Sequence, residues 1–290
     1  MTIINNLQNT DGWNISAIIP THNRANWLVG AIESVLRQSH PVAELIVVDD
    51  GSTDNTKEVV QKYANVRYIY QSQRGPSAAR NAGARMASGD WLAFLDSDDR
   101  WMQQKIAHQI AFLQAHSDMH AVYTDEIWIR NGRRVNQGKR HRKAGGWIFE
   151  MCIPLCIISP SSILLSRKLW QQSGGFDESL PACEDYDLWL RIAAKHPIGF
   201  IEMPLIEKNG GHSDQLSKQW GLDRYRVAAL EKILSDELPP KWRLLAIKQV
   251  LHQCKVLMLG FEKREKQDET IRFRKKYQHW QSVLQVASNA

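Results

Sequence analysis

The sequence predicts an α/β fold with a doubly wound, mostly parallel sheet and a helical extension at its C-terminal end. Three observations support this prediction. Short runs rich in strand-forming residues alternate with stretches of helical spacing over the first hundred residues. Polar residues gather where these runs end, as they do at the ligand-binding edge of such sheets. Beyond residue 211, helical patterns replace the strands.

The first half of the chain alternates predicted strands and helices in order. Residues 26–39 place their apolar side chains on one helical face, and residues 52–54 supply start signals for a second helix. A third helix begins near residue 75, and its many small residues permit close packing on a sheet. The predicted strands are residues 15–20, 44–50, 66–70 and 91–96.

The second half begins with a predicted helix from Trp101 to about Ala115. Residues 120–129 and 133–135 then flank Asn131-Gly132, which is a signal for a type I′ hairpin turn. The remaining predicted elements are a basic surface loop, a strand, a helix and a final strand, at residues 139–147, 159–166, 184–195 and 198–206.

Composition limits the cellular setting. No stretch reaches about 18 uninterrupted apolar residues, so no membrane-spanning helix is expected. The N-terminus lacks the basic and apolar regions of a signal peptide, which favours a cytoplasmic location. The four cysteines fit no zinc spacing and are expected to be reduced and structural.

The net charge of +6 is unevenly distributed, because residues 223–290 hold 14 Lys and Arg against 8 Asp and Glu. Together with the basic run at 133–143, this excess would suit peripheral contact with a membrane or another anionic surface. A solvated helical face is the alternative interpretation. Nucleic acid is not an expected partner, since no recognised binding module accompanies the charge.

Three carboxylates, Asp96, Asp98 and Asp99, follow the fourth predicted strand within four positions. Because like charges this close repel one another, such a cluster usually persists where a cation, a network of donors or a reaction uses it. The alternative is an acidic turn before the helix predicted to begin at Trp101, and Asp99 is expected to cap that helix.

Three ordered blocks resemble the family 2 glycosyltransferases of the GT-A fold: "SAIIPTHNRANWLVGAIESVLRQSHPVAELIVVDDGSTDNT", "GPSAARNAGARMASGDWLAFLDSDD" and "GGFDESLPACEDYDLWLRIA". The resemblance implies a GT-A domain at 15–212, divided into a nucleotide-sugar-binding half at 15–115 and an acceptor half at 116–212. Residues 1–14 would be an N-terminal extension, and residues 213–290 a basic helical extension.

The resemblance also implies a divalent cation, Mg²⁺ or Mn²⁺, beside the diphosphate of a sugar nucleotide. Asp96, Ser97 and Asp98 match the family's DxD motif, in which Asp98 is the direct metal ligand and Asp96 lies nearer the nucleotide. Carboxylate oxygens suit such hard cations. His212 matches a further metal or diphosphate contact, although a histidine in a Gly-rich loop can equally be an ordinary solvated residue.

Other positions are implied to bind the nucleotide sugar. Asp50 resembles the residue that accepts a hydrogen bond from the nucleobase, and its alternative is an ordinary turn with helix caps. Arg80 would either meet a phosphate or lie exposed on its helix. The expected contacts that follow the first strand are Pro20, Thr21, Asn23 and Arg24.

Glu184 and Asp185 match the family's ED motif. In an inverting transfer, Asp185 would be the general base that takes the proton of the acceptor hydroxyl, while Glu184 orients it or contacts the acceptor. Asp187 is expected to be structural, and three acidic residues in one first turn could also serve the helix dipole. Trp147 is the aromatic residue nominated for an acceptor groove.

The implied function is metal-dependent, inverting transfer of a sugar from a nucleoside-diphosphate sugar, such as a UDP-sugar. The acceptor would be a hydroxyl of a saccharide or lipid-linked molecule in cell-surface polysaccharide or glycolipid synthesis. Two alternatives stay open: a nucleotide-sugar-binding protein without turnover, and a nucleotidyltransferase. The latter is less favoured, because "PTHNRAN" is not a glycine-rich phosphate loop.

Overall fold

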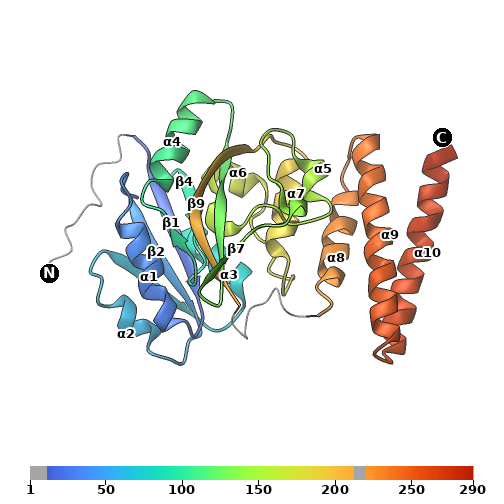
Figure 1. Cartoon of the computed structure of the whole chain (residues 1–290), viewed down its shortest axis with the longest axis horizontal. Coiled ribbons are helices and arrows are strands. Elements are labelled where there is room, and N and C mark those ends of the chain that lie inside the picture. Colours follow the sequence, from blue (N-terminus) through green and yellow to red (C-terminus); the bar gives the residue numbers. More distant parts are fainter. Residues whose placement is uncertain (1–11, 212–219, 290) are drawn as a thin grey trace.

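The computed structural model describes residues 12–211 and 220–289. Within these residues, nine strands form one sheet in the order β3-β2-β1-β4-β8-β6-β9-β5, with β7 paired to β6 (Figure 1). The strands are β1 (Ile15–Thr21), β2 (Glu44–Asp50), β3 (Val66–Gln71), β4 (Trp91–Phe94), β5 (Arg100–Trp101), β6 (Ala121–Arg130), β7 (Arg133–Val135), β8 (Leu164–Ser166) and β9 (Gly199–Gly210).

Helices cover both faces of the sheet, which explains why β1 is buried along its whole length. Successive side chains of a strand point to opposite faces, so Ile18 joins one apolar core while Ile15 and Ile19 join the other. The helices before the C-terminal region are α1 (Ala25–Leu36), α2 (Thr56–Val60), α3 (Pro76–Met86), α4 (Lys105–Ala115), α5 (Phe149–Cys152), α6 (Arg167–Gln172) and α7 (Glu184–Ala193).

The close packing expected of the third predicted helix is confirmed at Gly83 of α3. A Cβ atom on Gly83 would lie 2.5 Å from Ile18 Cγ2 on β1 and 3.1 Å from Val48 Cγ2 on β2. Only a residue without a side chain therefore fits at this crossing. The small residues of α3 bring its N-terminal end close to the ends of β1 and β2.

The sheet is mixed. The predicted parallel pairing holds for β3, β2, β1 and β4. In the second half, β8 runs antiparallel to both β4 and β6, while β6 and β9 are parallel. The direction changes at the short strand β8, which lies between β4 and β6 in the sheet.

Two element boundaries differ from the sequence prediction. The helix expected from Trp101 begins at Lys105, because Arg100 and Trp101 form β5 and pair antiparallel with Glu207 and Ile206 of β9. The strand expected at 159–166 is a 3₁₀ turn, η2 (Pro160–Ser162), followed by the three residues of β8. Both differences depend on pairing partners that are distant in sequence.

The predicted hairpin is confirmed, since Asn131 and Gly132 between β6 and β7 have φ angles of 49° and 72°. After β7, the rest of the basic run at 133–143 contains a short 3₁₀ turn, η1 (Lys139–His141). The predicted final strand, β9, continues beyond residue 206 to Gly210 beside β6. That extension carries Lys208 and Asn209 to the ligand-binding edge.

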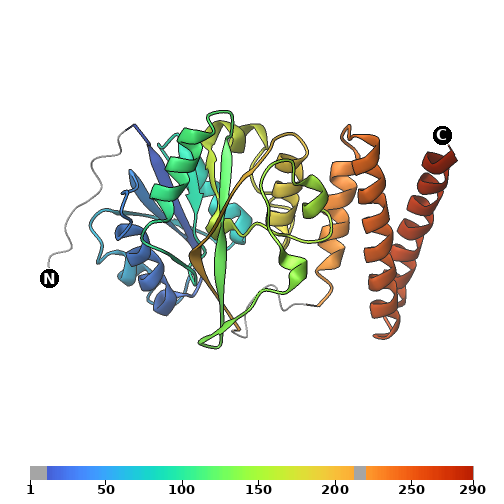
Figure 2. The ribbon, with the colours of Figure 1, turned by 45° about the horizontal axis from the view of Figure 1, so that its top comes forward.

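The helical C-terminal region comprises α8 (Asp223–Leu234), α9 (Pro240–Glu262) and α10 (Gln267–Asn289), which lie side by side beyond the sheet (Figures 1 and 2). The Lys232 ammonium of α8 lies 2.7 Å from Asp177 and 3.3 Å from Asp187 of α7. The pair with Asp187 joins the helical region to the helix that carries the ED motif, and the pair with Asp177 joins it to the segment before that helix.

One described helix, α9, is long and apolar enough to cross a membrane by length and composition. No membrane-spanning helix was expected from the sequence, because the apolar residues of α9 are interrupted by polar ones. About 39% of its most apolar stretch is buried. Its buried residues, such as Val250 and Leu257, belong to the core shared with α8 and α10. The buried core helix of a soluble protein can have the same length and composition.

Candidate active site

A cavity of about 650 Å³ opens where β1, β2 and β4 end, between the two halves of the chain. It brings together most of the residues nominated from the sequence, although they come from five separate segments. His212 lies outside the described residues, and Asn23 does not line the cavity. The nominated residues that line it are Pro20, Thr21, Arg24, Asp50, Arg80, Asp96, Ser97, Asp98, Glu184 and Asp185.

The acidic loop after β4 separates its three carboxylates by environment. Asp99 is buried, accepts a 2.6 Å hydrogen bond from the Ser161 hydroxyl and accepts another at 2.9 Å from the backbone N–H of Asn209. Asp99 therefore ties β9 to the loop, and the expectation that it caps a helix at Trp101 is wrong. Burial, followed by the charges of Asp98 and Asp96, raises the pKa of Asp99.

Arg80 of α3 lies between two carboxylates of the cavity. Its guanidinium donates to Asp96 Oδ1 at 2.7 Å and to Glu184 Oε1 at 2.6 Å, and only 6% of its side chain is exposed. The alternative of an exposed helix arginine is therefore wrong. Burial alone would lower the pKa of Arg80, but the two carboxylates outweigh burial and raise it.

Asp50 at the end of β2 organises the turn that leads into α3. Its Oδ1 accepts from Gln71 Nε2 at 2.7 Å and from the Arg74 backbone at 2.8 Å, while Oδ2 accepts from the Gly75 backbone at 2.7 Å. A carboxylate offers about four acceptor positions. Three are used by these bonds, which leaves one position on Oδ2 for a donor from a ligand.

The loop after β1 has a mixed role. Thr21 lines the cavity, and its buried hydroxyl has no hydrogen-bond partner among the described residues. Asn23 instead holds the neighbouring turn, because its Oδ1 accepts from the Thr53 backbone at 2.8 Å and its own N–H donates to Ser52 Oγ at 2.8 Å. The side chain that lines the cavity between them is His22.

The acidic first turn of α7 also divides into distinct roles. Asp185 is partly exposed on the cavity wall, where its Oδ1 accepts from the Tyr186 backbone at 2.7 Å. Asp187 is buried and bonded to Arg191 at 2.6 Å, which agrees with the structural role expected for it. The Cys156 thiol lies beside Asp185, and burial followed by that carboxylate raises the pKa of Cys156.

Sequence reasoning missed a charged group on the acceptor side of the cavity, formed by Glu126, Lys143 and Lys208. The Lys143 ammonium lies 3.2 Å from Glu126 and 3.3 Å from Asp125. Burial alone would raise the pKa of Glu126, but the ammoniums of Lys208 and Lys143 outweigh it and lower the pKa to about 2.

Lys208 stands across from Trp128 in the β6–β9 register, so it lies on the same sheet face as Glu126. Burial alone would lower the pKa of Lys208, but the negative charges of Glu126, Asp99, Asp96 and Asp185 raise it. A signal for Lys208 existed in "MPLIEKNG", where the strand pattern continues past residue 206.

The carboxylates of the acidic loop can hold a divalent cation only when a bound ligand supplies further oxygen atoms to coordinate it. Residues 12–211 and 220–289 contain no group of three or more His, Cys, Asp or Glu side chains that could hold a metal by themselves. Mg²⁺ usually keeps one or two protein carboxylates and takes its other ligands from water and phosphates. Asp98 and Asp96 meet that requirement.

The sequence on both sides of the cavity matches models of a known protein family. The model of "Glycosyl transferase family 2" matches residues 16–168, which is more than half of the chain. The chain belongs to glycosyl transferase family 2. A second model, "Glycosyltransferase like family 2", matches residues 139–225. The first match includes Asp50 and Asp98, and the second includes Asp185.

Curated relatives of this family 2 glycosyltransferase agree. An uncharacterized glycosyltransferase of Rickettsia felis is 35% identical over 202 residues, which are 68% of this chain and 33% of the relative. The chain thus spans about a third of that relative's length. A UDP-Glc:α-D-GlcNAc-diphosphoundecaprenol β-1,3-glucosyltransferase of Escherichia coli is 30% identical, with coverage of 62% of this chain and 70% of the relative.

Solved structures show the GT-A fold for this family 2 glycosyltransferase. S. aureus TarS in complex with UDP-GlcNAc superposes with a TM-score of 0.68 at 18% identity, covering 92% of each chain. A mannosyltransferase from Pyrobaculum calidifontis, solved with GDP-Man and Mn²⁺, superposes with a TM-score of 0.58 at 18% identity, covering 95% of this chain and 84% of the other. The sequence match shows the family of the chain, and the solved structures show its fold.

Proposed function

We propose that this family 2 glycosyltransferase transfers a sugar from a UDP-sugar to an acceptor hydroxyl, with inversion at the anomeric carbon and with a divalent cation. One observation carries the proposal. Asp50, Asp96 and Asp98 of the nucleotide-sugar side face the same cavity as Asp185 of the acceptor side. A donor and an acceptor held in one cavity become neighbours for a direct displacement.

On the donor side, buried polar groups have capacity left for a ligand. Among the described residues, the Thr21 hydroxyl has no hydrogen-bond partner, and Asp50 keeps one acceptor position that suits the N–H of a nucleobase imide. Arg80 lines the same wall and is fixed by Asp96 and Glu184, which gives a phosphate a positive group of fixed position. Ser97, Pro20 and Arg24 complete this side of the proposed site.

Asp98, with Asp96 beside it and His212 from the segment outside the described residues, would hold Mg²⁺ or Mn²⁺. A bound cation of this kind offsets the negative charge that grows on a departing diphosphate. The protein groups act on the other side of the reaction. In particular, no protein acid is required to protonate the departing nucleotide.

The proposed base is Asp185. As the acceptor oxygen bonds to the anomeric carbon, the bond from that carbon to the phosphate oxygen breaks, and the acceptor proton passes to the Asp185 carboxylate. Attack opposite the leaving group inverts the configuration. Glu184 is buried and bound to Arg80, so its role would be to hold the first turn of α7, and thereby Asp185, against α3.

The substrate classes follow from the relatives. The E. coli relative is named for a UDP-Glc donor and a diphosphoundecaprenol-linked acceptor, and TarS was solved with UDP-GlcNAc. Both names support a UDP-sugar donor, and the name of the E. coli relative supports a saccharide or lipid-linked acceptor. These classes are typical of cell-surface polysaccharide or glycolipid synthesis, which is the process we propose.

We also propose that the enzyme is cytoplasmic and meets a membrane peripherally through basic segments. Residues 213–290 would form an extension to a catalytic unit at 15–212. Most basic side chains of the run at 133–143 are exposed, whereas the Lys143 side chain is buried at Glu126. Co-sedimentation that is equal for vesicles with and without anionic lipid would exclude this contact. The exposed members are Arg133, Arg134, Lys139, Arg140 and Arg142.

The experiment that tests the function is a panel of UDP-, GDP- and dTDP-sugars, assayed for binding and for release of nucleoside diphosphate with Mn²⁺, Mg²⁺ or EDTA. We expect UDP-sugar binding and UDP release that EDTA abolishes. Absence of nucleotide binding in every condition would contradict the proposal. Normal binding without turnover on any acceptor would favour a binding protein, and release of pyrophosphate from a nucleoside triphosphate would favour a nucleotidyltransferase.

A further inference from the structure

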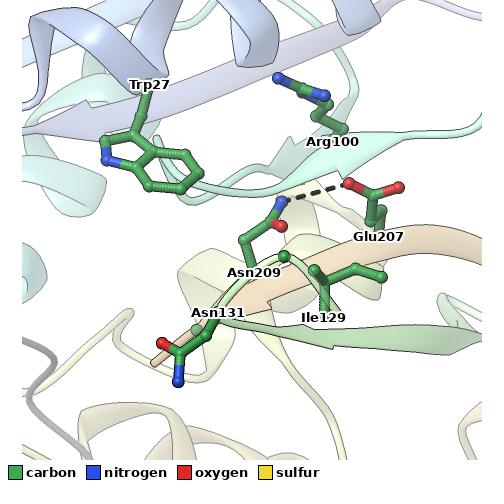
Figure 3. A pocket seen from close by; sticks show the side chains of 8 residues that line it. Trp27, Arg100, Ile129, Asn131, Glu207 and Asn209 are labelled. Atoms are coloured by element: carbon green, nitrogen blue, oxygen red, sulfur yellow. Dashed lines mark hydrogen bonds between the residues drawn. The ribbon is translucent and has the colours of Figure 1, made fainter. Parts of the chain in front are cut away.

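A second pocket of about 460 Å³ adjoins the active-site cavity (Figure 3). Its walls come from α1, β5, the turn between β6 and β7, and the end of β9. Ile129, Asn209 and Gly210 line both spaces, so only the strand ends of β6 and β9 separate them. The residues that line the second pocket are Trp27, Arg100, Ile129, Asn131, Gly132, Glu207, Asn209 and Gly210.

The second pocket combines an aromatic ring with polar groups of both hydrogen-bonding kinds. The Trp27 side chain from α1 is 39% exposed. Figure 3 shows Trp27 and Arg100 on one side of the pocket, with Glu207 and Asn209 of β9 on the other. Asn209 Nδ2 lies 3.5 Å from Glu207 Oε1, so the side-chain amide of Asn209 and the carboxylate of Glu207 stand side by side.

The strands and helices determine where these side chains lie. Arg100 and Glu207 are register partners in the antiparallel β5–β9 pair. Arg100 then lies along α1, because Gly30 has no side chain there and a Cβ atom would lie 2.6 Å from Arg100 Nε. The turn residues Asn131 and Gly132 close the pocket from the hairpin side.

We propose that the second pocket binds a further sugar unit of a neutral saccharide acceptor, whose reacting unit lies in the active-site cavity. This inference rests on the function proposed above. A sugar ring presents C–H groups on its faces and hydroxyls around its edge. The amphipathic indole of Trp27 suits such a face, while Arg100 donates to hydroxyls, Glu207 accepts from them, and Asn209 does both.

The charges of the pocket favour a neutral ligand. Arg100 alone would attract a phosphate or a uronic acid, but Glu207 faces the same space with the opposite charge. An anion would gain at one residue and lose at the other. Asn209 and Gly210 line both spaces, so a saccharide unit in the second pocket would lie next to the unit in the active-site cavity.

Saturation-transfer NMR with cellobiose, lactose and N,N′-diacetylchitobiose tests the inference, using the full chain with UDP and diamagnetic Mg²⁺ present. We expect at least one disaccharide to bind the wild type. Trp27→Ala should bind it roughly three- to tenfold more weakly, as loss of one aromatic contact implies. Glu207→Gln keeps the shape of the pocket and should also weaken binding. Inorganic phosphate should not displace the sugar.

Trp147→Ala is the matched control, because Trp147 is 60% exposed and lines neither space, contrary to the acceptor groove expected for it from the sequence. It should bind the sugar as the wild type does, and all variants should keep the wild-type thermal midpoint and UDP affinity. Equal sugar affinity in Trp27→Ala and the wild type, absence of binding by every disaccharide, or displacement by phosphate would overturn the inference. Failure of the wild type to bind UDP would instead contradict the proposed function.

Discussion

Arg80 and Glu184 join the two halves of the active-site cavity through a 2.6 Å hydrogen bond between buried side chains. The bond connects α3, which follows the donor-side loops, to the first turn of α7, which carries Asp185. Because Arg80 also holds Asp96, one guanidinium sets the spacing between the acidic loop after β4 and the proposed base.

Arg80→Met should lower the free energy of unfolding by about 3 kcal/mol, because two carboxylates would lose their buried partner. Urea denaturation followed by circular dichroism measures this change. Arg85→Met, on the same helix, is the control: its side chain is 54% exposed and lies 3.3 Å from Glu178, so a loss below about 1 kcal/mol is expected. Equal losses in the two variants would contradict the coupling role of Arg80.

Asp98→Asn should abolish the part of UDP-sugar binding that depends on Mn²⁺, because a neutral amide is a poor ligand for a hard cation. Calorimetric titration with and without EDTA gives that difference directly. Asp90→Asn is the control, since Asp90 is exposed at the opposite end of β4. Unchanged metal dependence in Asp98→Asn would exclude Asp98 as the metal ligand.

Gly83→Ala should destabilise the protein by roughly 1–3 kcal/mol, because the new methyl group meets Ile18 of a packed strand at 2.5 Å. Thermal and urea unfolding report this loss. Gly30→Ala of α1 is the control and should destabilise the protein less. Its methyl group meets only the far end of the long, flexible Arg100 side chain, and alanine favours a helix. If both variants unfold alike, the close packing of α3 on β1 is not what requires Gly83.

The contact between Asp177 and Lys232 should make stability depend on pH. Burial alone would raise the pKa of Asp177, but hydrogen bonds from Lys232 and Ser179 lower it from 3.8 to about 2. A lowered pKa stabilises the fold above the ordinary value, and the contribution is lost as the pH falls from about 4 through about 2.

The wild type should therefore exceed Asp177→Asn in stability by about 1 kcal/mol at pH 6, allowing for solvent screening of this partly exposed pair, and by almost nothing at pH 2. Unfolding midpoints across this range measure the difference. Asp236→Asn is the control, because the Asp236–Lys195 pair is 41% and 62% exposed. A constant difference between wild type and Asp177→Asn at all pH values would contradict the assignment.

Local patterns were sufficient for much of the fold. The apolar run that forms β1, the turn at Asn131 and Gly132, and the small residues around Gly83 each have one structural solution that nearby residues determine. The same reasoning gave Asp99 a different role from Asp96 and Asp98, although the role that it gave, capping a helix at Trp101, was wrong. Local patterns therefore predict where an element lies in the sequence and which of its faces is buried.

Long-range partners were not predictable in this way. The pairing of β5 with β9 turned an expected helix start into a strand, and it delivered Asn209 to Asp99. Lys143 was expected in a basic surface loop, yet its side chain is buried against Glu126. A sequence without contacts does not state which carboxylate a distant lysine will meet, so the charged group beside Asp185 emerged only from the structure.

The central claim is that Asp185 removes the acceptor proton in a site that binds the donor without it. Its most direct test is the transfer rate of Asp185→Asn at saturating UDP-sugar, measured with the donor Kd of the same preparation. We predict an unchanged Kd and a transfer rate lower by about 10²- to 10⁴-fold, the usual contribution of a general base. Full turnover by Asp185→Asn would contradict the account.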